Sequence, residues 1–328
     1  MILKIIYFIY LSFILLIASC AILLQKNIVD KNIVDKNIVD KNIVDKNIVE
    51  NFIDNNVHTN INFFFEKAFN SNIYYKGNFD YSKNKIDIVV CNHLSILDWL
   101  VCYSLINKTK DKPLHIVHKK SLFSLPILGT ILKNQNNIAL DRNYSKDKSV
   151  IINFLNNLDK GIILLYPEGT RITKKKMKES IEYSNSNNKH VFDKCLYPRT
   201  KGYNLITKVL KKKNKLGNII DLTIRTDNFN NIHSLKHIFK NHIGNFYVDI
   251  ENYNETDTEL ISIWKQKDDK LKQKLNKKLY KKYFNKFHLM YFFVVLSIVV
   301  LTFILIYKKY YNLLLGFSVI NLILNYQM

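Results

Sequence analysis

The chain has 328 residues, with 49 Lys plus Arg against 27 Asp plus Glu, so its formal net charge is +22. This excess predicts a polyanionic partner, and charge alone does not separate nucleic acid, an anionic membrane surface and phosphorylated substrates. Four cysteines stand at positions 20, 91, 102 and 195 without a CxxC or CxxxxC spacing. This pattern argues against a zinc site and a disulfide framework, so no metal is expected.

The first predicted element is a membrane helix. Ile5 to Leu24 carries no charge over 20 residues, close to the roughly 20 that a spanning helix needs. A cleaved signal peptide is the alternative, because Ala18 to Ala21 is small enough for a protease, yet its apolar core is usually about 7–15 residues long. We therefore expect residues 1–25 to form an uncleaved N-terminal membrane anchor.

A short repeat follows this anchor. Residues 26–50 contain KNIVD four times and then KNIVE. A five-residue period advances a helix by about 500°, so the Ile-Val pairs make no constant apolar face. A stacked β-solenoid would have too few coils to bury a continuous core. We interpret this segment as a low-complexity spacer.

From about residue 73, short apolar runs alternate with helical segments. Five runs are typical of strands, several of them buried on both faces: 85–91, 114–119, 137–140, 161–166 and 218–224. Helical length and spacing occur at 95–106 and 149–158. The alternation predicts an α/β domain over residues 51–265, with a mostly parallel mixed sheet flanked by helices and sites just beyond the carboxyl ends of the strands.

The strand that ends at Cys91 is followed by Asn92 and His93, and Asp98 lies in the helical segment after it. A carboxylate that binds one imidazole nitrogen leaves the other free as a base, so this pair would take a proton from an alcohol. Ser95 and Asp98 also have the spacing of an N-cap and its N3 acid. In that interpretation Asp98 only caps a helix, and this short segment alone favours it.

A second polar segment, YPEGTR, follows the apolar run at 161–166. It offers a flexible glycine, a hydroxyl and a guanidinium at the same layer of the sheet as His93. Arg171 is a candidate phosphate anchor, because arginine binds phosphate through two parallel hydrogen bonds; a solvated surface turn is its alternative. Asp141 and Arg142 end a third strand, and Arg142 offers a second cation for the same phosphate.

The last part of the chain is predicted to return to a bilayer. Lys270 to His288 holds eight lysines and no acid, and Leu289 to Tyr307 is an uncharged run of 19 residues. A basic cluster beside a spanning helix is typical of the cytoplasmic side, where it meets anionic lipid. We expect a basic juxtamembrane segment at 266–288, a C-terminal membrane hairpin at 289–328 and a central domain that faces the cytosol.

Four blocks, in order over about residues 85–225, resemble those of the glycerolipid acyltransferase family, which includes the 1-acylglycerol-3-phosphate acyltransferases. NHLSILD matches the family's NHxxxxD, NIALDR is similar to its second block, YPEGTR matches its third, and LYPRTKG resembles its proline-centred fourth. PEGTRIT followed at a distance by PRTKG is similar to the branch of eukaryotic lysophosphatidate and lysocardiolipin acyltransferases.

The resemblance implies that residues 51–265 are an acyltransferase domain of a membrane-bound 1-acyl-sn-glycerol-3-phosphate O-acyltransferase. His93, oriented by Asp98, would deprotonate the free hydroxyl of lysophosphatidic acid as it attacks acyl-CoA, giving phosphatidic acid. The substrate-binding residues would be Asn92, Arg142, Glu168, Gly169, Thr170, Arg171 and Pro198. Acyl-CoA is a co-substrate and no cofactor is expected. The expected partners are acyl-CoA, a lysophospholipid and the lipid bilayer, with no nucleic acid, and the expected location is the endoplasmic reticulum membrane.

Several alternatives stay open at this point. The acceptor could equally be lysocardiolipin, lysophosphatidylinositol or glycerol-3-phosphate. Cys91 would share a side of the strand with His93 and act as a thiol nucleophile, although a small cysteine inside a strand is usually core. A basic membrane tether with inert motifs is the non-enzyme alternative. A serine hydrolase is disfavoured because the chain has no GxSxG elbow.

Overall fold

The structure is a computed structural model. It describes residues 69–106, 112–125, 135–229, 242–253 and 259–283, together with Glu66, Gly129, Leu132, Lys133 and Ile238. These residues belong to one compact unit, Met1–Asn285. The expected membrane anchor, repeat spacer and C-terminal hairpin lie outside the described residues. None of the described helices is long and apolar enough to cross a membrane.

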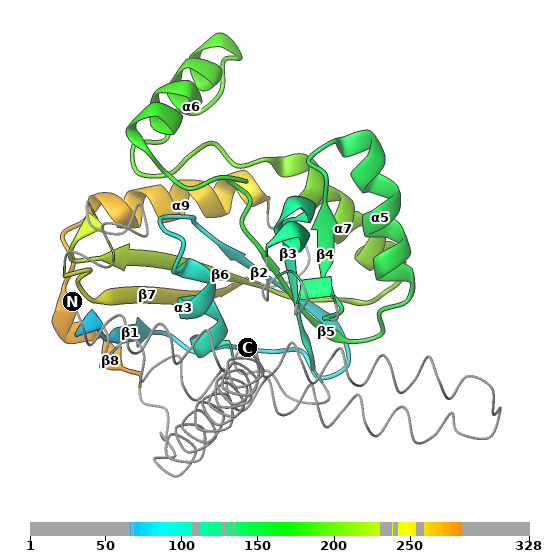
Figure 1. The fold of residues 1–328 in the computed structure, drawn as a ribbon, viewed down its shortest axis with the longest axis horizontal. Helices are drawn as coiled ribbons and strands as arrows, with labels where there is room; N and C mark the ends of the chain where they lie inside the picture. Colours follow the sequence, from blue (N-terminus) through cyan, green and yellow to red (C-terminus); the bar gives the residue numbers. More distant parts are fainter. Residues whose placement is uncertain are drawn as a thin grey trace, which may run out of the picture. The chain divides into compact units, whose positions relative to one another are not determined.

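The described residues hold eight strands. Their bounds are β1 Ile73–Lys76, β2 Ile86–Cys91, β3 Leu114–Lys119, β4 Ile138–Leu140, β5 Gly161–Leu165, β6 Leu216–Thr226, β7 Phe246–Tyr253 and β8 Lys281–Lys282. They form one sheet in the order β4-β3-β5-β2-β6-β7-β1-β8 (Figure 1). Five neighbouring pairs are parallel, whereas β6–β7 and β1–β8 are antiparallel. The predicted mostly parallel mixed sheet is therefore confirmed.

The helices that flank this sheet vary in how strongly they pack. Their bounds are α3 Asp98–Leu105, α5 Tyr144–Asn156, α6 Lys174–Ser186, α7 Thr200–Lys212 and α9 Leu260–Lys272, with short 3-10 turns η2 Lys120–Ser124 and η4 Lys277–Leu279. Helix α9 lies on one side of β6 and β7 and α3 on the other, while α6 stands away from the sheet (Figure 1). In α6 only Ser184 is buried, so packing contributes little to holding it.

The core explains the apolar runs. Every residue of β2 and β5 is buried, because central strands of a parallel sheet have cover on both faces. Ile86, Ile88 and Val90 of β2 pack in a large cluster that includes Ile263 and Trp264 of α9. Burial of a large apolar side chain contributes roughly 1.5–3 kcal/mol each, and this cluster anchors α9 on the sheet.

The register of the parallel strands brings two sequence motifs to one edge. Val90 of β2 pairs with Leu165 of β5, so the residues that follow these strands leave the sheet side by side. On the neighbouring pair, Lys119 of β3 pairs with Leu140 of β4. The predicted site residues therefore all follow the carboxyl ends of strands, where open α/β sheets form their sites. They are Asn92, His93, the PEGTR segment and Arg142.

Candidate active site

A histidine and an aspartate are bonded at the end of β2. His93 Nδ1 lies 2.8 Å from Asp98 Oδ2, with a side-chain exposure of 25% for the histidine and 0% for the aspartate. The same Oδ2 accepts a hydrogen bond from the Ser95 backbone N–H at 2.8 Å. A buried carboxylate that accepts from Nδ1–H fixes the tautomer, so Nε2 has the free lone pair. The two interpretations of Asp98 are therefore not exclusive, since it contacts the imidazole and the helix start together.

The turn that carries His93 is fixed to the sheet by its neighbour. Asn92 Nδ2 donates to the carbonyl oxygen of Ile224 at 3.0 Å, and Ile224 N–H donates to Asn92 Oδ1 at 2.8 Å. Asn92 is buried, and both functions of its amide are satisfied by β6. These two hydrogen bonds hold the turn that carries His93 against β6, and the role of Asn92 in substrate binding stays a prediction.

The PEGTR loop closes over the same turn. Gly169 adopts a φ of +66° and its N–H donates to the Tyr166 carbonyl oxygen at 2.9 Å, which makes a tight turn. Ile172 N–H then donates to the His93 carbonyl oxygen at 2.8 Å. The Tyr166 ring lies against the imidazole, with centroids 4.7 Å apart. Two motifs that are far apart in the sequence therefore form one structural unit.

The Glu168 side chain of this loop points into the protein interior and not toward solvent. It is only 3% exposed, and its two carboxylate oxygens have no hydrogen bond of good geometry among the described residues. The backbone amides of His93 and Leu196 are close enough to favour its charge, yet burial dominates and raises its pKa well above 4.5. Glu168, which belongs to the PEGTR loop, thus lies beside the backbone of both the NHLSILD and the LYPRTKG motifs.

Arginine side chains meet at the other side of the loop. A Cβ built on Gly169 would come within 3.1 Å of Arg199 Nε, so the missing side chain leaves room for that guanidinium. Arg199 N–H also donates to the Pro167 carbonyl oxygen at 2.8 Å. Burial and the neighbouring Arg199 lower the pKa of Arg142 below its usual value. Arg142 itself holds a left-handed φ of +65°.

The remaining predicted residues occupy the same loop region. Thr170 and Arg171 are half-buried in the PEGTR loop, and Pro198 is buried beside Arg199. Sequence reasoning quoted Arg199 within PRTKG without assigning it a role. Its guanidinium is suited to binding an anion, but no local pattern indicates that it approaches Gly169.

Sequence reasoning also missed a buried ion pair behind the site. Lys267 of α9 is 0% exposed, and its Nζ lies 2.5 Å from Asp221 Oδ1 and donates to the Leu222 carbonyl oxygen at 2.7 Å. Leu222 pairs with Cys91 at the end of β2. Burial disfavours the ammonium, but Asp221 and other anionic groups raise the pKa of Lys267 above its usual value. No sequence pattern distinguishes this lysine from its many exposed neighbours.

The thiol alternative finds no support in the geometry. Cys91 is 0% exposed, its Sγ lies 3.6 Å from Cys102 Sγ, and burial raises its pKa well above 9.0. A buried thiol with a raised pKa is a poor nucleophile. Among the described residues no three His, Cys, Asp or Glu side chains are grouped so that they could hold a metal.

Comparison with known proteins matches this region to a family. Residues 72–210 match the sequence profile described as Acyltransferase. A 1-acyl-sn-glycerol-3-phosphate acyltransferase 2 of Brassica napus is 34% identical over 143 residues, which are 42% of this chain and 36% of that protein. Lysocardiolipin acyltransferase 1 of Gallus gallus is 26% identical over 55% of this chain and 50% of its own length.

Two further relatives extend the comparison. The 2-acyl-1-lysophosphatidylinositol acyltransferase of Saccharomyces cerevisiae is 26% identical over 55% of this chain and 59% of its own length. A crystal structure of a 1-acyl-sn-glycerophosphate acyltransferase from Thermotoga maritima aligns with a TM-score of 0.49 and 14% identity, covering 84% of this chain and 99% of that one. The chain spans 36% to 59% of the length of the three curated relatives.

Proposed function

We propose that the chain is a member of the glycerolipid acyltransferase family and that it transfers an acyl chain from acyl-CoA to the free hydroxyl of lysophosphatidic acid, as the match of residues 72–210 and the similarity to curated relatives support. The product would be phosphatidic acid. The observation that carries the proposal is the His93–Asp98 pair, with 2.8 Å between Nδ1 and Oδ2, in a turn that is hydrogen-bonded to the PEGTR loop.

The reaction follows from this pair. The acceptor hydroxyl gives its proton to His93 Nε2 while its oxygen forms a bond with the thioester carbonyl carbon. The resulting imidazolium is stabilised by the buried Asp98 carboxylate. Collapse of the tetrahedral intermediate breaks the carbon–sulfur bond, and the leaving thiolate takes the proton from His93. A positioned general base of this kind contributes a rate factor of typically about 10²–10⁴.

A covalent acyl-enzyme is unnecessary in this scheme. A thioester is already activated, so alignment of hydroxyl, carbonyl and base supplies most of the remaining rate enhancement. The buried Cys91 and Cys102 thiols pack against each other, which supports a core role for both. Cys91→Ala is therefore expected to keep most of the activity.

The phosphate of the acceptor would be held by the arginines around Gly169. Arg142 and Arg199 are close enough to interact electrostatically, and no carboxylate pairs with either among the described residues. Two adjacent like charges without a counter-ion repel each other, so an anion between them stabilises the arrangement. Arginine also binds phosphate bidentately. We assign Arg199 to this site beside Arg142 and Arg171.

The identity of the acceptor is tested by comparing the rates of acyl transfer to four candidate acceptors. The full-length protein in isolated membranes is given one labelled acyl-CoA and, separately, lysophosphatidic acid, lysocardiolipin, lysophosphatidylinositol and glycerol-3-phosphate. Labelled phosphatidic acid should form fastest. Faster acylation of lysocardiolipin or lysophosphatidylinositol would show that the proposed acceptor is wrong, while the proposed type of reaction would stand. No thiol release with any acceptor would instead favour the inert membrane tether.

The location is part of the same proposal. The uncharged segments at 5–24 and 289–307 and the lysines of 270–288 support a bilayer-bound protein with a cytosolic domain. A membrane-bound enzyme would receive its lysophospholipid from the bilayer and acyl-CoA from the cytosol. We propose the endoplasmic reticulum membrane, which organelle fractionation of the tagged full-length chain would test.

A further inference from the structure

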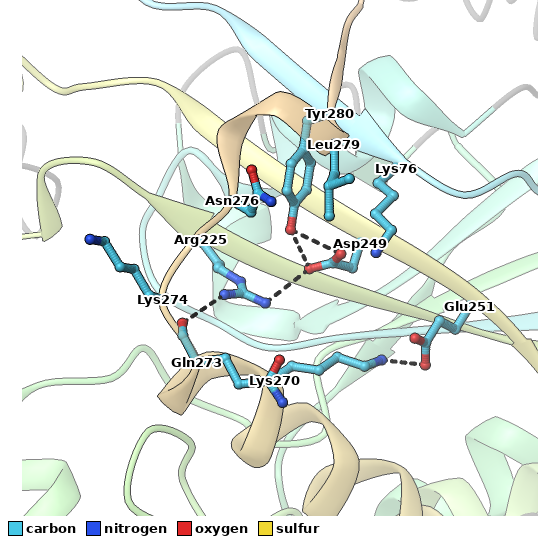
Figure 2. Close-up of a pocket in the computed structure, with 10 residues that line it drawn as sticks. All are labelled: Lys76, Arg225, Asp249, Glu251, Lys270, Gln273, Lys274, Asn276, Leu279 and Tyr280. Atoms are coloured by element: carbon cyan, nitrogen blue, oxygen red, sulfur yellow. Dashed lines mark hydrogen bonds and ion pairs between the residues drawn. The ribbon is translucent and has the colours of Figure 1, made fainter.

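A polar pocket lies away from the His93 turn. Its volume is about 330 Å³, and its walls come from β1, β6, β7, the end of α9 and the segment that follows α9. Its charged lining comprises Lys76, Arg225, Lys270, Lys274, Asp249 and Glu251. Figure 2 shows Lys76 and Lys274 on opposite sides of the Arg225–Asp249 pair. Four cations therefore face two carboxylates in one small space.

Both carboxylates already have partners. Asp249 Oδ2 lies 3.3 Å from Arg225 Nη2, and the Tyr280 hydroxyl donates to Asp249, with its oxygen 2.8 and 2.9 Å from the two carboxylate oxygens. Glu251 pairs with Lys270 and accepts from the Tyr253 hydroxyl at 3.1 Å. These contacts are drawn in part in Figure 2. The negative charge of the pocket is thus neutralised from within.

The positive charge is left in excess. Lys76 and Lys274 are exposed, and within the described part of the chain no carboxylate pairs with either of them. Arg225 donates through Nη1 to the Gln273 carbonyl oxygen at 3.2 Å, while its Nε is buried without a hydrogen-bond partner. A pocket with two uncompensated ammonium groups and an unsatisfied guanidinium N–H attracts an anion.

The rim of the pocket has the character of a membrane-contact surface. Leu279 lines it and is 55% exposed, between the lysine pairs at 277–278 and 281–282. An apolar side chain among lysines is the composition that suits the boundary between headgroups and acyl chains. In the sequence, the uncharged run Leu289 to Tyr307 follows shortly after this rim.

We propose that this pocket binds the phosphodiester headgroup of an anionic phospholipid, with Lys76 and Lys274 on either side of the phosphate and Leu279 in the bilayer interface. A pocket of this size suits a headgroup, since ligand pockets begin at about 300 Å³. Such a site would hold the domain at one orientation on a charged bilayer. It does not depend on the acyl transfer reaction, because its charged lining includes none of the residues around His93.

The test measures affinity by isothermal titration calorimetry. Dihexanoylphosphatidylglycerol is titrated into the full-length protein held in detergent micelles. Dihexanoylphosphatidylcholine is the matched ligand, because it keeps the phosphate and adds a compensating cation. The Lys76→Gln/Lys274→Gln variant removes the two lining charges at exposed positions. The control, Lys208→Gln/Lys212→Gln, removes two exposed lysines of α7 that neither line the pocket nor flank Leu279. Melting temperatures check that both variants fold.

Each lysine near an anionic lipid contributes about a fivefold effect on affinity, so removing both lining lysines should weaken binding roughly 25-fold. The control pair and His93→Ala should bind like the wild type, and phosphatidylcholine should bind much more weakly. If both lysine-pair variants lost affinity equally, diffuse surface charge would explain the binding and the pocket proposal would be wrong. Equal affinity for inorganic phosphate would overturn the assignment to a lipid.

Discussion

Replacing Asp98 by asparagine tests the catalytic pair with almost no change in shape. Asp98 Oδ2 accepts from both His93 Nδ1 and Ser95 N–H at 2.8 Å. The asparagine oxygen can still accept from Ser95 N–H, so the turn should keep its conformation. The substitution removes the negative charge beside the imidazole and admits the opposite tautomer, in which Nε2 is protonated and cannot act as the base.

The size of the effect follows from these two losses. A hydrogen bond to a charged group contributes about 1.5–3 kcal/mol, which corresponds to roughly 10–100-fold in rate. The same substitution in a Ser-His-Asp triad costs about 10⁴ in kcat through the wrong tautomer. Because Asp98 is 0% exposed, water does not compensate for the missing charge. We expect kcat to fall about 10²–10⁴-fold, with little change in the KM of either substrate.

The assay is the initial rate of thiol release from acyl-CoA by the full-length protein, with the acceptor at saturation. Ser95→Ala is the control, since Ser95 Oγ accepts from Leu97 N–H at 3.0 Å and supports the helix start without touching the imidazole. It should lose up to about 2 kcal/mol of stability and little kcat. Equal losses of kcat in the two variants would refute the catalytic role and leave Asp98 as a helix cap.

Three further outcomes are expected. Arg199→Gln and Arg142→Gln should each raise the acceptor KM about 10–100-fold, because a charged hydrogen bond to phosphate is lost; initial rates at varied acceptor would show this, and an unchanged KM would contradict it. Lys267→Met should lower the free energy of unfolding by about 3–5 kcal/mol, since it leaves Asp221 buried and unpaired, and Lys267→Met/Asp221→Leu should recover most of it in denaturant titrations. Glu168 has a raised pKa, so its contribution to stability is present below pH 4.5 and is lost as pH rises through the folded-state value. Glu168→Gln should therefore gain thermal stability relative to wild type as pH rises from 4.5 to 8, and a constant difference would contradict this.

The central strands were predictable because their composition leaves little choice. The predicted strands at 85–91, 114–119, 137–140 and 161–166 each agree with the structure to within one residue at either end. In β2 and β5 every residue except Asp87 is apolar and every residue is buried, as expected for strands covered on both faces. The predicted 218–224 is longer in the structure, Leu216–Thr226, because its ends pair with β7 beyond the apolar stretch.

The sequence did not predict strands β7, β1 and β8, which lie together at one end of the sheet, nor helices α6, α7 and α9. β1 and β8 consist largely of tyrosines and lysines. β1 pairs with β7 and β8 pairs with β1, and each of these partners lies far away in the sequence. The helix predicted at 149–158 begins earlier, at Tyr144, because the Asn143 side chain accepts from Ser145 N–H. The helix predicted at 95–106 begins later, at Asp98, after a turn that Ser95 stabilises.

In the candidate site too, contacts between residues close in sequence were easier to predict than contacts between distant ones. His93 and Asp98 are five residues apart, so their spacing allowed the contact that the structure shows, although that spacing alone favoured a helix cap. The approach of Arg199 to Gly169 depends on the backbone hydrogen bond between Arg199 and Pro167, which no local pattern encodes. The Lys267–Asp221 pair joins α9 to β6 across the core, and only the packing of the sheet brings them together.

The most direct test of the account compares wild type with His93→Ala in one assay, the formation of labelled phospholipid from acyl-CoA and lysophosphatidic acid. The account predicts that product forms with equal release of thiol in the wild type and falls at least about 10²-fold in the variant, as expected for loss of a general base. Undiminished transfer by His93→Ala would contradict the account at its centre.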